Sequence, residues 1–272
     1  SRPGESIVAE ARALAARGVK ELLLISQDTT FYGIDRHERG ALARLLRELN
    51  KVEGLSWIRL LYLYPTTITD DVLEAMADCE KVCRYVDLPL QHASADVLRR
   101  MRRPGNRQTY DKLLARIRDR VPGVTLRTTF IVGFPGETEE EFQETLSLVE
   151  QVEFDDAYTF KYSVREGTPA VRIKDHVSEE TKTERIGRLI ATVRRIAKRK
   201  NMGLVGSTHE VLVEGPAKRG DLLQARTRTN KIALLEGPAE WIGTYRTVRF
   251  TGTTGSTFTA WPVDRELAAT WV

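Results

Sequence analysis

Apolar and polar positions alternate along the first 165 or so residues in two different rhythms. Within residues 5–17, Ile7, Ala11 and Leu14 recur at the spacing of one helix face, and Gly18 follows as a stop. The next segment, VKELLLIS at 19–26, is a short and nearly continuous apolar run, which predicts a buried strand. The two patterns return several times in this order. They predict βα units, in which helices cover a parallel sheet.

The expected elements follow this alternation up to residue 202. Helices are predicted over 5–17, 38–52, 69–78, 94–102, 107–120, 139–152 and 178–202, and strands over 19–26, 57–65, 84–90, 124–133 and 156–163. Thr138 and Glu141 form the T-x-x-E pattern of a capping box before the helix at 139–152. The repeats predict either a parallel barrel or a doubly wound sheet. No G-x-G-x-x-G follows the first strand, which disfavours a dinucleotide site.

Polar and small residues follow each predicted strand. The segments read SQDTTFYG (26–33), YLYPTT (62–67), PLQHAS (89–94), VGFPGET (132–138) and YSVREGT (162–168). In a parallel barrel the carboxyl ends of the strands meet on one face, where the chemistry takes place. Any one of these loops is ordinary, but the set of them together predicts a site for a polar ligand.

The pattern changes after the last of these helices, which is rich in Arg and Lys. From Val205 onward short β segments alternate with turns, and this predicts a small barrel. We therefore expect an α/β domain over 1–202 that ends in a basic helix, a small all-β domain over 203–263, and a tail over 264–272.

Composition limits the class of protein. The chain has 272 residues, of which 41% are hydrophobic and 29% charged, so a packed core is possible. No apolar run reaches the ~18 residues of a membrane span, and the first residues lack the apolar segment of a secretory signal. The net charge of +4 is too small to establish nucleic-acid binding by itself. We expect a cytoplasmic protein with no membrane partner.

Four of the motifs resemble those of the radical S-adenosylmethionine methylthiotransferases. They are SQDTTFYG at 26–33, DLPLQHAS at 87–94, GFPGET at 133–138 and YSVREGTPA at 162–170. The segment after residue 203 resembles the TRAM domain of that family, a small β-barrel associated with RNA or protein substrates. The resemblance implies an α/β fold: a partial radical SAM (βα) barrel followed by the small all-β barrel.

The resemblance also implies cofactors. The family binds S-adenosylmethionine, and it holds a catalytic 4Fe-4S cluster with a C-x-x-x-C-x-x-C motif after the first barrel strand. Here Cys79 and Cys83 lie before a strand and have no third partner, so they cannot hold such a cluster. We expect them to act as small hydrophobes. We also expect the chain to be the C-terminal part of a longer enzyme, without the first strand and the cluster loop and inactive alone.

The matched motifs assign residues to the cofactor, all of them at or near a strand end. The resemblance implies Ile131 and Gly133 beside the adenine, Gln27 and Asp28 at the methionine end, Gln91 and Ser94 at the ribose and methionine, and Glu137 in the same loop as Gly133. Glycine at 133 would let the backbone approach the ligand closely.

Three of the polar residues leave alternatives open. Arg127 could form a bidentate fork on the methionine carboxylate, or an internal ion pair with Asp28, Asp87 or Glu137. Glu137 could equally serve as the acidic residue at a helix N-terminus. We expect His92 to be a hydrogen-bonded structural residue rather than a base.

Three motifs divide between two different substrates within the family. QDTT and DLPLQH are typical of the RimO-type branch, which modifies an aspartate of a small-subunit ribosomal protein. RTRTNK at 226–231 is closer to the MiaB-type branch, which modifies isopentenyladenosine beside a tRNA anticodon. Because more positions match in the barrel, we expect the ribosomal protein as partner, with Arg226, Arg228 and Lys231 binding substrate. The alternative from another class is a non-catalytic module that binds RNA or the ribosome.

Overall fold

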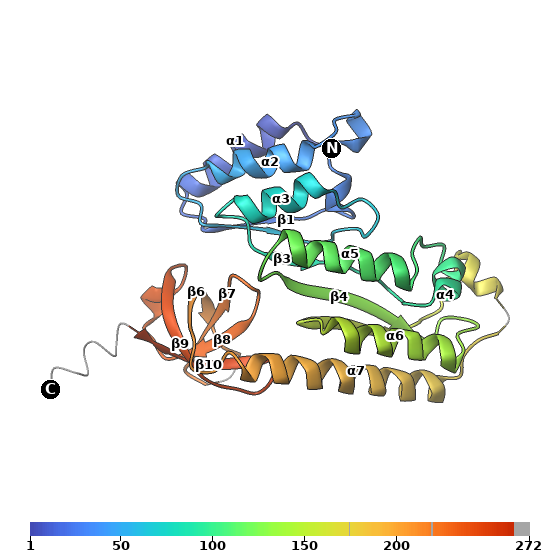
Figure 1. Ribbon diagram of the computed structural model, residues 1–272. Helices are drawn as coiled ribbons and strands as arrows, with labels where there is room; N and C mark the ends of the chain where they lie inside the picture. Colours follow the sequence, from blue (N-terminus) through green and yellow to red (C-terminus); the bar gives the residue numbers. More distant parts are fainter. Residues whose placement is uncertain (174, 219, 264–272) are drawn as a thin grey trace.

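A computed structural model describes residues 1–173, 175–218 and 220–263. Figure 1 shows two parts, a larger α/β part and a small barrel, with one long helix running from the first to the second. Within the described residues no helix is both long enough and apolar enough to cross a membrane.

The larger part is built on five parallel strands. They are β1 (Glu21–Leu24), β2 (Trp57–Leu60), β3 (Tyr85–Asp87), β4 (Thr125–Val132) and β5 (Asp156–Lys161). β1 pairs with β2, and β3, β4 and β5 pair in that order. A bridge between Ile58 and Val82, and a 2.9 Å hydrogen bond from Leu63 N to Asp87 O, join the two sets. The strands therefore follow one another in chain order, as a partial barrel requires.

Helices connect and cover these strands. They are α1 (Gly4–Ala16), α2 (Ala41–Asn50), α3 (Asp70–Asp78), α4 (Ala95–Arg100), α5 (Arg107–Arg120), α6 (Glu139–Val152) and α7 (Glu179–Met202), with short 3-10 turns at Thr29–Phe31, Ile34–Arg36, Pro169–Arg172 and Ala239–Trp241. The capping box predicted from Thr138 and Glu141 is present at the start of α6. Apolar side chains on the inner helix faces, such as Leu46 and Phe142, are fully buried against the strands. Each buries enough apolar surface to stabilise the fold by about 1.5–3 kcal/mol.

The small barrel is closed, as expected from its short β segments. Its strands are β6 (Thr208–Pro216), β7 (Leu223–Thr227), β8 (Ile232–Leu235), β9 (Tyr245–Thr253) and β10 (Thr257–Pro262), in the order β10-β8-β7-β6-β9. Alternate residues point inward, and Phe250 stacks on Phe258 in the centre with 4.0 Å between ring centroids. The predicted tail over 264–272 lies outside the described residues.

The small barrel packs against the amino-terminal ends of the first three strands. Glu21, Trp57 and Tyr85 begin β1, β2 and β3, and each contacts the small barrel. Trp57 meets the ring of Tyr245 edge-on, with 4.8 Å between centroids. The opposite, carboxyl ends of the strands stay uncovered by this domain. The fold therefore keeps open the edge at which a ligand site was predicted.

Cys79 and Cys83 are free and buried, which fits the small hydrophobes expected from their surroundings. Burial raises the pKa of both thiols, so they stay protonated at neutral pH. Neither side chain is placed to serve as a thiolate ligand.

Candidate cofactor site

The carboxyl ends of the strands surround a cavity of about 750 Å³. Gln27 and Asp28, which follow β1, and Gln91, which follows β3, line it together with Asp87 and Thr129. Three of the predicted cofactor residues are therefore brought together, although they are up to 64 positions apart in the chain (91 minus 27). A cavity of this size is typical of small-molecule sites.

Asp28 organises the loop after β1. Its carboxylate accepts a hydrogen bond from Thr30 N at 2.9 Å and another from Thr67 Oγ1 at 3.2 Å. Thr29 donates to the carbonyls of Leu61 and Tyr62 at the end of β2. These contacts join two neighbouring strand ends, and they leave the exposed Gln27 beside the cavity.

Gln91 lies in a constrained backbone conformation against β4. Its φ is +73°, in the left-handed region that few non-glycine residues adopt. Its N–H donates to Thr129 O at 2.8 Å, and its carbonyl accepts from Ile131 N at 2.9 Å. These bonds place Gln91 next to Ile131, the residue expected beside the adenine. Backbone strain of this kind persists only where surrounding contacts enforce it.

The loop at 133–137 turns on Gly133 and Glu137. Gly133 has a φ of +73°, and a Cβ built there would lie 2.3 Å from Lys182 Cγ on α7. The Glu137 carboxylate is fully buried and accepts from Gly133 N at 2.9 Å. Arg185, also on α7, lies 2.8 Å from the other carboxylate oxygen. Glu137 thus has a structural function beyond that of an acid at a helix N-terminus.

His92 and Ser94 are both buried in the loop after β3. Ser94 N donates to His92 Nδ1 at 3.0 Å, and His92 Nε2 lies 3.3 Å from Glu137. This supports the expected structural role of His92. Ser94 begins α4 as its N-cap residue. Ser94, Ile131, Gly133 and Glu137 lie around the cavity rather than in its lining.

Arg127 is held in an internal ion pair, and its partner is Asp87. Two parallel hydrogen bonds join them, Nε to Oδ1 at 3.0 Å and Nη2 to Oδ2 at 2.9 Å. Burial works to lower the pKa of Arg127, but the bonds to Asp87 outweigh it, so the guanidinium stays charged. Arg127 is six residues before Gly133 along the strand, about 20 Å away at 3.3 Å per residue. The geometry favours the ion pair over a fork on the cofactor carboxylate.

Aromatic side chains form part of the cavity wall, which sequence reasoning missed. Tyr62, Tyr158 and Phe160 line it and are about half exposed. Tyr158 and Phe160 alternate along β5, so they face the same side of the sheet. The sequence shows that alternation. It does not show that β5 is an edge strand, and without that knowledge aromatic residues in a strand are expected in the core.

Comparison with known proteins agrees with this geometry. Residues 1–149, more than half of the chain, match the Radical SAM superfamily. The chain belongs to the radical SAM superfamily. Residues 204–257, which contain most of the small barrel, match the TRAM domain. The expected fold, a partial radical SAM barrel followed by a TRAM barrel, is confirmed.

Curated relatives carry two different names. A tRNA-2-methylthio-N(6)-dimethylallyladenosine synthase of Clostridium botulinum (strain Langeland) is 42% identical over 92% of this chain and 56% of its own length. A ribosomal protein uS12 methylthiotransferase RimO of Pelobacter propionicus is 48% identical over 82% of this chain and 50% of its own length. The chain therefore spans about half the length of the curated relatives that it matches.

A solved structure supports the fold. Coproporphyrinogen III oxidase (HemN) from Escherichia coli, a radical SAM enzyme, aligns with a TM-score of 0.55 at 15% identity. The alignment covers 94% of this chain and 64% of that one. At this identity the likeness shows the shared fold alone.

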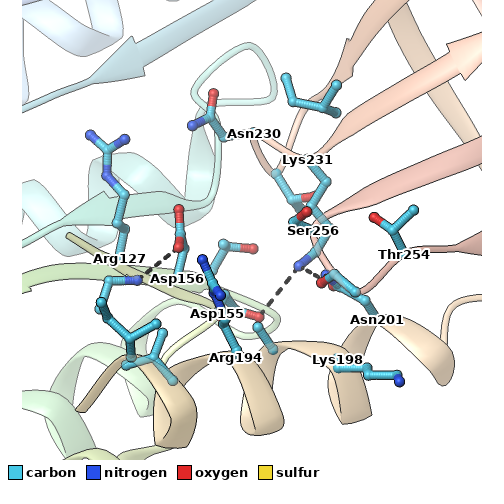
Figure 2. Close-up of a pocket in the computed structure, with 18 of the residues that line it drawn as sticks. Arg127, Asp155, Asp156, Arg194, Lys198, Asn201, Asn230, Lys231, Thr254 and Ser256 are labelled. Carbon is cyan, nitrogen blue, oxygen red and sulfur yellow. Dashed lines mark hydrogen bonds and ion pairs between the residues drawn. The ribbon is translucent and has the colours of Figure 1, made fainter. Parts of the chain in front are cut away.

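A second cavity, of about 730 Å³, lies between the radical SAM domain and the TRAM barrel. Figure 2 shows Lys231 pointing between Asp155 and Asn201, with Nζ 2.8 Å from Asn201 Oδ1 and 3.8 Å from the Asp155 carboxylate. Burial lowers the pKa of Lys231, and the nearby Asp155 carboxylate partly offsets this. The first residues of β4 and β5, Thr125 and Asp156, line this cavity, so it lies away from the carboxyl edge.

The other two predicted substrate-binding residues also contact the radical SAM domain. Arg226 forms ion pairs with Glu21 of β1 and Glu214 of β6. Arg228 accepts a 2.8 Å hydrogen bond from Arg59 through its carbonyl, and its guanidinium reaches Val82 O at 3.4 Å. Substrate binding by these residues stays a prediction, and the contacts that they make here are within the chain.

Most of the basic side chains of helix α7 are neutralised by ion pairs within the chain. Six of its eight Lys and Arg residues over 182–200 form ion pairs with Asp or Glu; they are Lys182, Arg185, Arg188, Arg195, Arg199 and Lys200. Several of the partners are on or beside α6. Most of the charge therefore attaches the helix to its neighbour.

Proposed function

We propose that this chain is part of an S-adenosylmethionine-dependent methylthiotransferase. The observation that carries the proposal is the cavity at the carboxyl edge, where Gln27, Asp28 and Gln91 meet beside the strand that leads to Gly133. Membership of the radical SAM superfamily supports it, and so do the names of relatives at 42–48% identity.

The residues at this edge fit S-adenosylmethionine. Gln27, Asp28 and Gln91 offer polar groups to its methionine end and ribose. For the adenine we propose the segment at Ile131 and Gly133, which lies beside the cavity lining; the space that a Cβ at 133 would take is filled by Lys182 and not by a ligand. The cofactor would supply a 5′-deoxyadenosyl radical and a methyl group. In that scheme the chain's own residues bind and orient the cofactor.

The described residues offer no site for the iron–sulfur cluster that the family implies. Among them, no group of three or more His, Cys, Asp or Glu side chains could hold a metal ion. Cys79 and Cys83 are buried as protonated thiols. We therefore derive no step through a cluster from this chain.

For the substrate, we propose an aspartate of a small-subunit ribosomal protein. The QDTT and DLPLQH motifs at the cavity support it, and so do RimO-named relatives at 46% and 48% identity. The motif that favoured tRNA, RTRTNK at 226–231, contacts the radical SAM domain through Arg226, Arg228 and Asn230. Its composition is thus explained by domain packing, and it carries little weight for the choice of substrate.

A tRNA adenosine is the second candidate. Tyr62, Tyr158 and Phe160 present exposed rings to the cavity, and aromatic side chains are the usual platforms on which unpaired bases stack. Relatives named as tRNA-2-methylthio-N(6)-dimethylallyladenosine synthases are 42–44% identical.

Mass spectrometry of both substrates tests the proposal. A strain that lacks the gene is complemented with the intact gene or with an empty vector, and its ribosomal protein uS12 and tRNA are digested and analysed. We expect a methylthio group on an aspartate of the ribosomal protein only when the gene is present. A methylthio group on tRNA adenosine alone would establish the second candidate instead. If neither target changes, the methylthiotransferase proposal is wrong.

A further inference from the structure

Glu137 is a fully buried carboxylate beside the cavity, and its partners come from three segments. Its Oε2 accepts from Gly133 N at 2.9 Å and lies 3.3 Å from His92 Nε2. Its Oε1 and its backbone carbonyl both accept from Arg185 Nη1, at 2.8 and 3.0 Å. A buried carboxylate without such partners would be very costly. Loop 133–137, loop 91–94 and α7 are therefore joined through one side chain.

The hydrogen bond from Ser94 to His92 determines which ring nitrogen faces Glu137. Because Ser94 N donates to Nδ1, that nitrogen carries no proton. The other ring nitrogen, Nε2, is buried 3.3 Å from Glu137 Oε2, in contact range but with no hydrogen bond to a described residue. His92 thus connects the backbone of Ser94 to the carboxylate that holds Gly133.

Helix α7 packs directly against loop 133–137. The Lys182 side chain covers Gly133 so closely that a Cβ would meet its Cγ at 2.3 Å. One turn later along the helix, Arg185 is buried with its guanidinium on Glu137. At the other end of α7, Asn201 bonds to Gly255 and Lys231 of the TRAM domain. The loop is therefore supported from outside the strand-end motifs.

We propose that Arg185 and His92 are positioning residues for the cofactor. Through Glu137 they hold the Gly133 backbone and the Gln91–Ser94 segment in the relative position that the adenosine part of S-adenosylmethionine requires. This inference rests on the proposed cofactor, but it concerns residues that the strand-end motifs do not explain. Neither side chain needs to touch the ligand.

The test uses the complete 272-residue chain and four variants. Arg185→Gln removes the cation, Arg185→Lys keeps it, and His92→Leu removes the imidazole ring that contacts Glu137 and accepts from Ser94. Arg188→Gln is the matched control, because Arg188 lies one turn away from the Arg185 contact and pairs with Glu139 and Glu184 at the surface. Calorimetry measures the affinity for S-adenosylmethionine, and hydrogen–deuterium exchange measures protection of residues 131–138 without ligand.

We expect Arg185→Gln and His92→Leu to weaken binding at least tenfold, and to speed exchange in residues 131–138 while exchange in α2 stays unchanged. Arg185→Lys should bind within threefold of wild type, and Arg188→Gln within twofold. Wild-type affinity and exchange in Arg185→Gln would overturn the inference, as would faster exchange spread over the whole domain. If the wild-type chain itself does not bind S-adenosylmethionine, the proposed function fails, while the exchange data still decide the role of Arg185 in the loop.

Discussion

Arg226 of the TRAM barrel forms a bidentate ion pair with Glu21 of the radical SAM domain. Nη2 lies 2.5 Å from Oε2 and Nη1 lies 3.1 Å from Oε1. Arg59 reaches the same carboxylate at 2.8 Å and also bonds to the Thr227 and Arg228 carbonyls. The domain boundary is therefore crossed by a mostly buried ionic cluster. Bidentate pairs of this kind fix orientation as well as energy.

Removal of Arg226 should loosen the two domains. Arg226→Ala leaves Glu21, whose side chain is 5% exposed, with Arg59 as its remaining cation. Breaking a buried pair from one side typically costs 3–5 kcal/mol, and we expect about 3 kcal/mol here because Arg59 remains. Urea unfolding at neutral pH measures the loss.

Arg195→Ala is the control for that experiment, because Arg195 pairs with Glu150 at the surface. It should cost less than about 1 kcal/mol. Equal effects of the two variants would show that the cluster does not hold the domains together. If substrate binding is lost in Arg226→Glu, that loss would report separation of the domains as readily as loss of a substrate contact.

Gly133→Ala should destabilise the cofactor loop for two separable reasons. A φ of +73° costs an alanine about 1–2 kcal/mol, and the new Cβ would also meet Lys182 Cγ at 2.3 Å. Gly123→Ala is a matched control, because Gly123 has a φ of +74° with nothing within 4 Å. Thermal unfolding should show a larger loss of stability for Gly133→Ala than for Gly123→Ala. Adding Lys182→Ala to Gly133→Ala should restore only the excess of the first loss over the second. Equal losses at both positions would mean that α7 does not press on the loop.

Acidification should weaken the TRAM barrel through His209. Burial, with a smaller effect of the Lys231 ammonium, lowers the pKa of His209 below its ordinary 6.5. Above that value both states are neutral at this site; as pH falls below it, the unfolded chain binds a proton that the folded chain does not. Stability should therefore fall with pH, by at most ~1.4 kcal/mol per unit from this group. In His209→Gln the free energy of unfolding should depend less on pH between about pH 6.5 and 5 than it does in wild type. The same pH dependence in both proteins would contradict the assignment to His209.

The outer edge of β1 should promote self-association. Within the described residues β1 pairs only with β2, and the side chains of Leu23 and Ile25 are 50% and 63% exposed. An apolar strand edge with free backbone groups is a template for pairing. Light scattering should show concentration-dependent association of the chain, reduced by Ile25→Lys but not by Met202→Lys, which changes an apolar residue of α7 that is 52% exposed. A clean monomer at high concentration would contradict this prediction.

Local signals predicted the helices well and the strand lengths less well. The helix at 107–120 and the one at 139–152 have the predicted bounds, because side-chain caps at Asn106 and Thr138 mark their first turns. The second strand was predicted over 57–65 but ends at Leu60. Tyr62 adopts a φ of +55°, which takes the chain out of the sheet before Pro65 does. Hydrophobicity alone does not reveal that turn.

The sequence predicted the site residues only where they follow the ends of parallel strands. Parallel strands end at a common edge, so Gln27, Asp28 and Gln91 could be expected to meet. The partners of Glu137 and Arg226 could not, because Arg185 is 48 positions and Glu21 is 205 positions away along the chain. In the sequence both arginines read as parts of a basic surface. Only the fold shows that their charges are used inside the protein.

Titration of the chain with S-adenosylmethionine tests the central claim most directly. Calorimetry on the wild-type chain should show one site, with weaker binding of free methionine, because the Ile131 and Gly133 segment serves the adenosine part. Gln91→Ala removes a polar side chain from the cavity, and this variant should bind S-adenosylmethionine more weakly than the wild-type chain does. If no heat of binding appears at millimolar ligand, or if Gln91→Ala binds as well as wild type, the carboxyl edge of these strands is not the cofactor site.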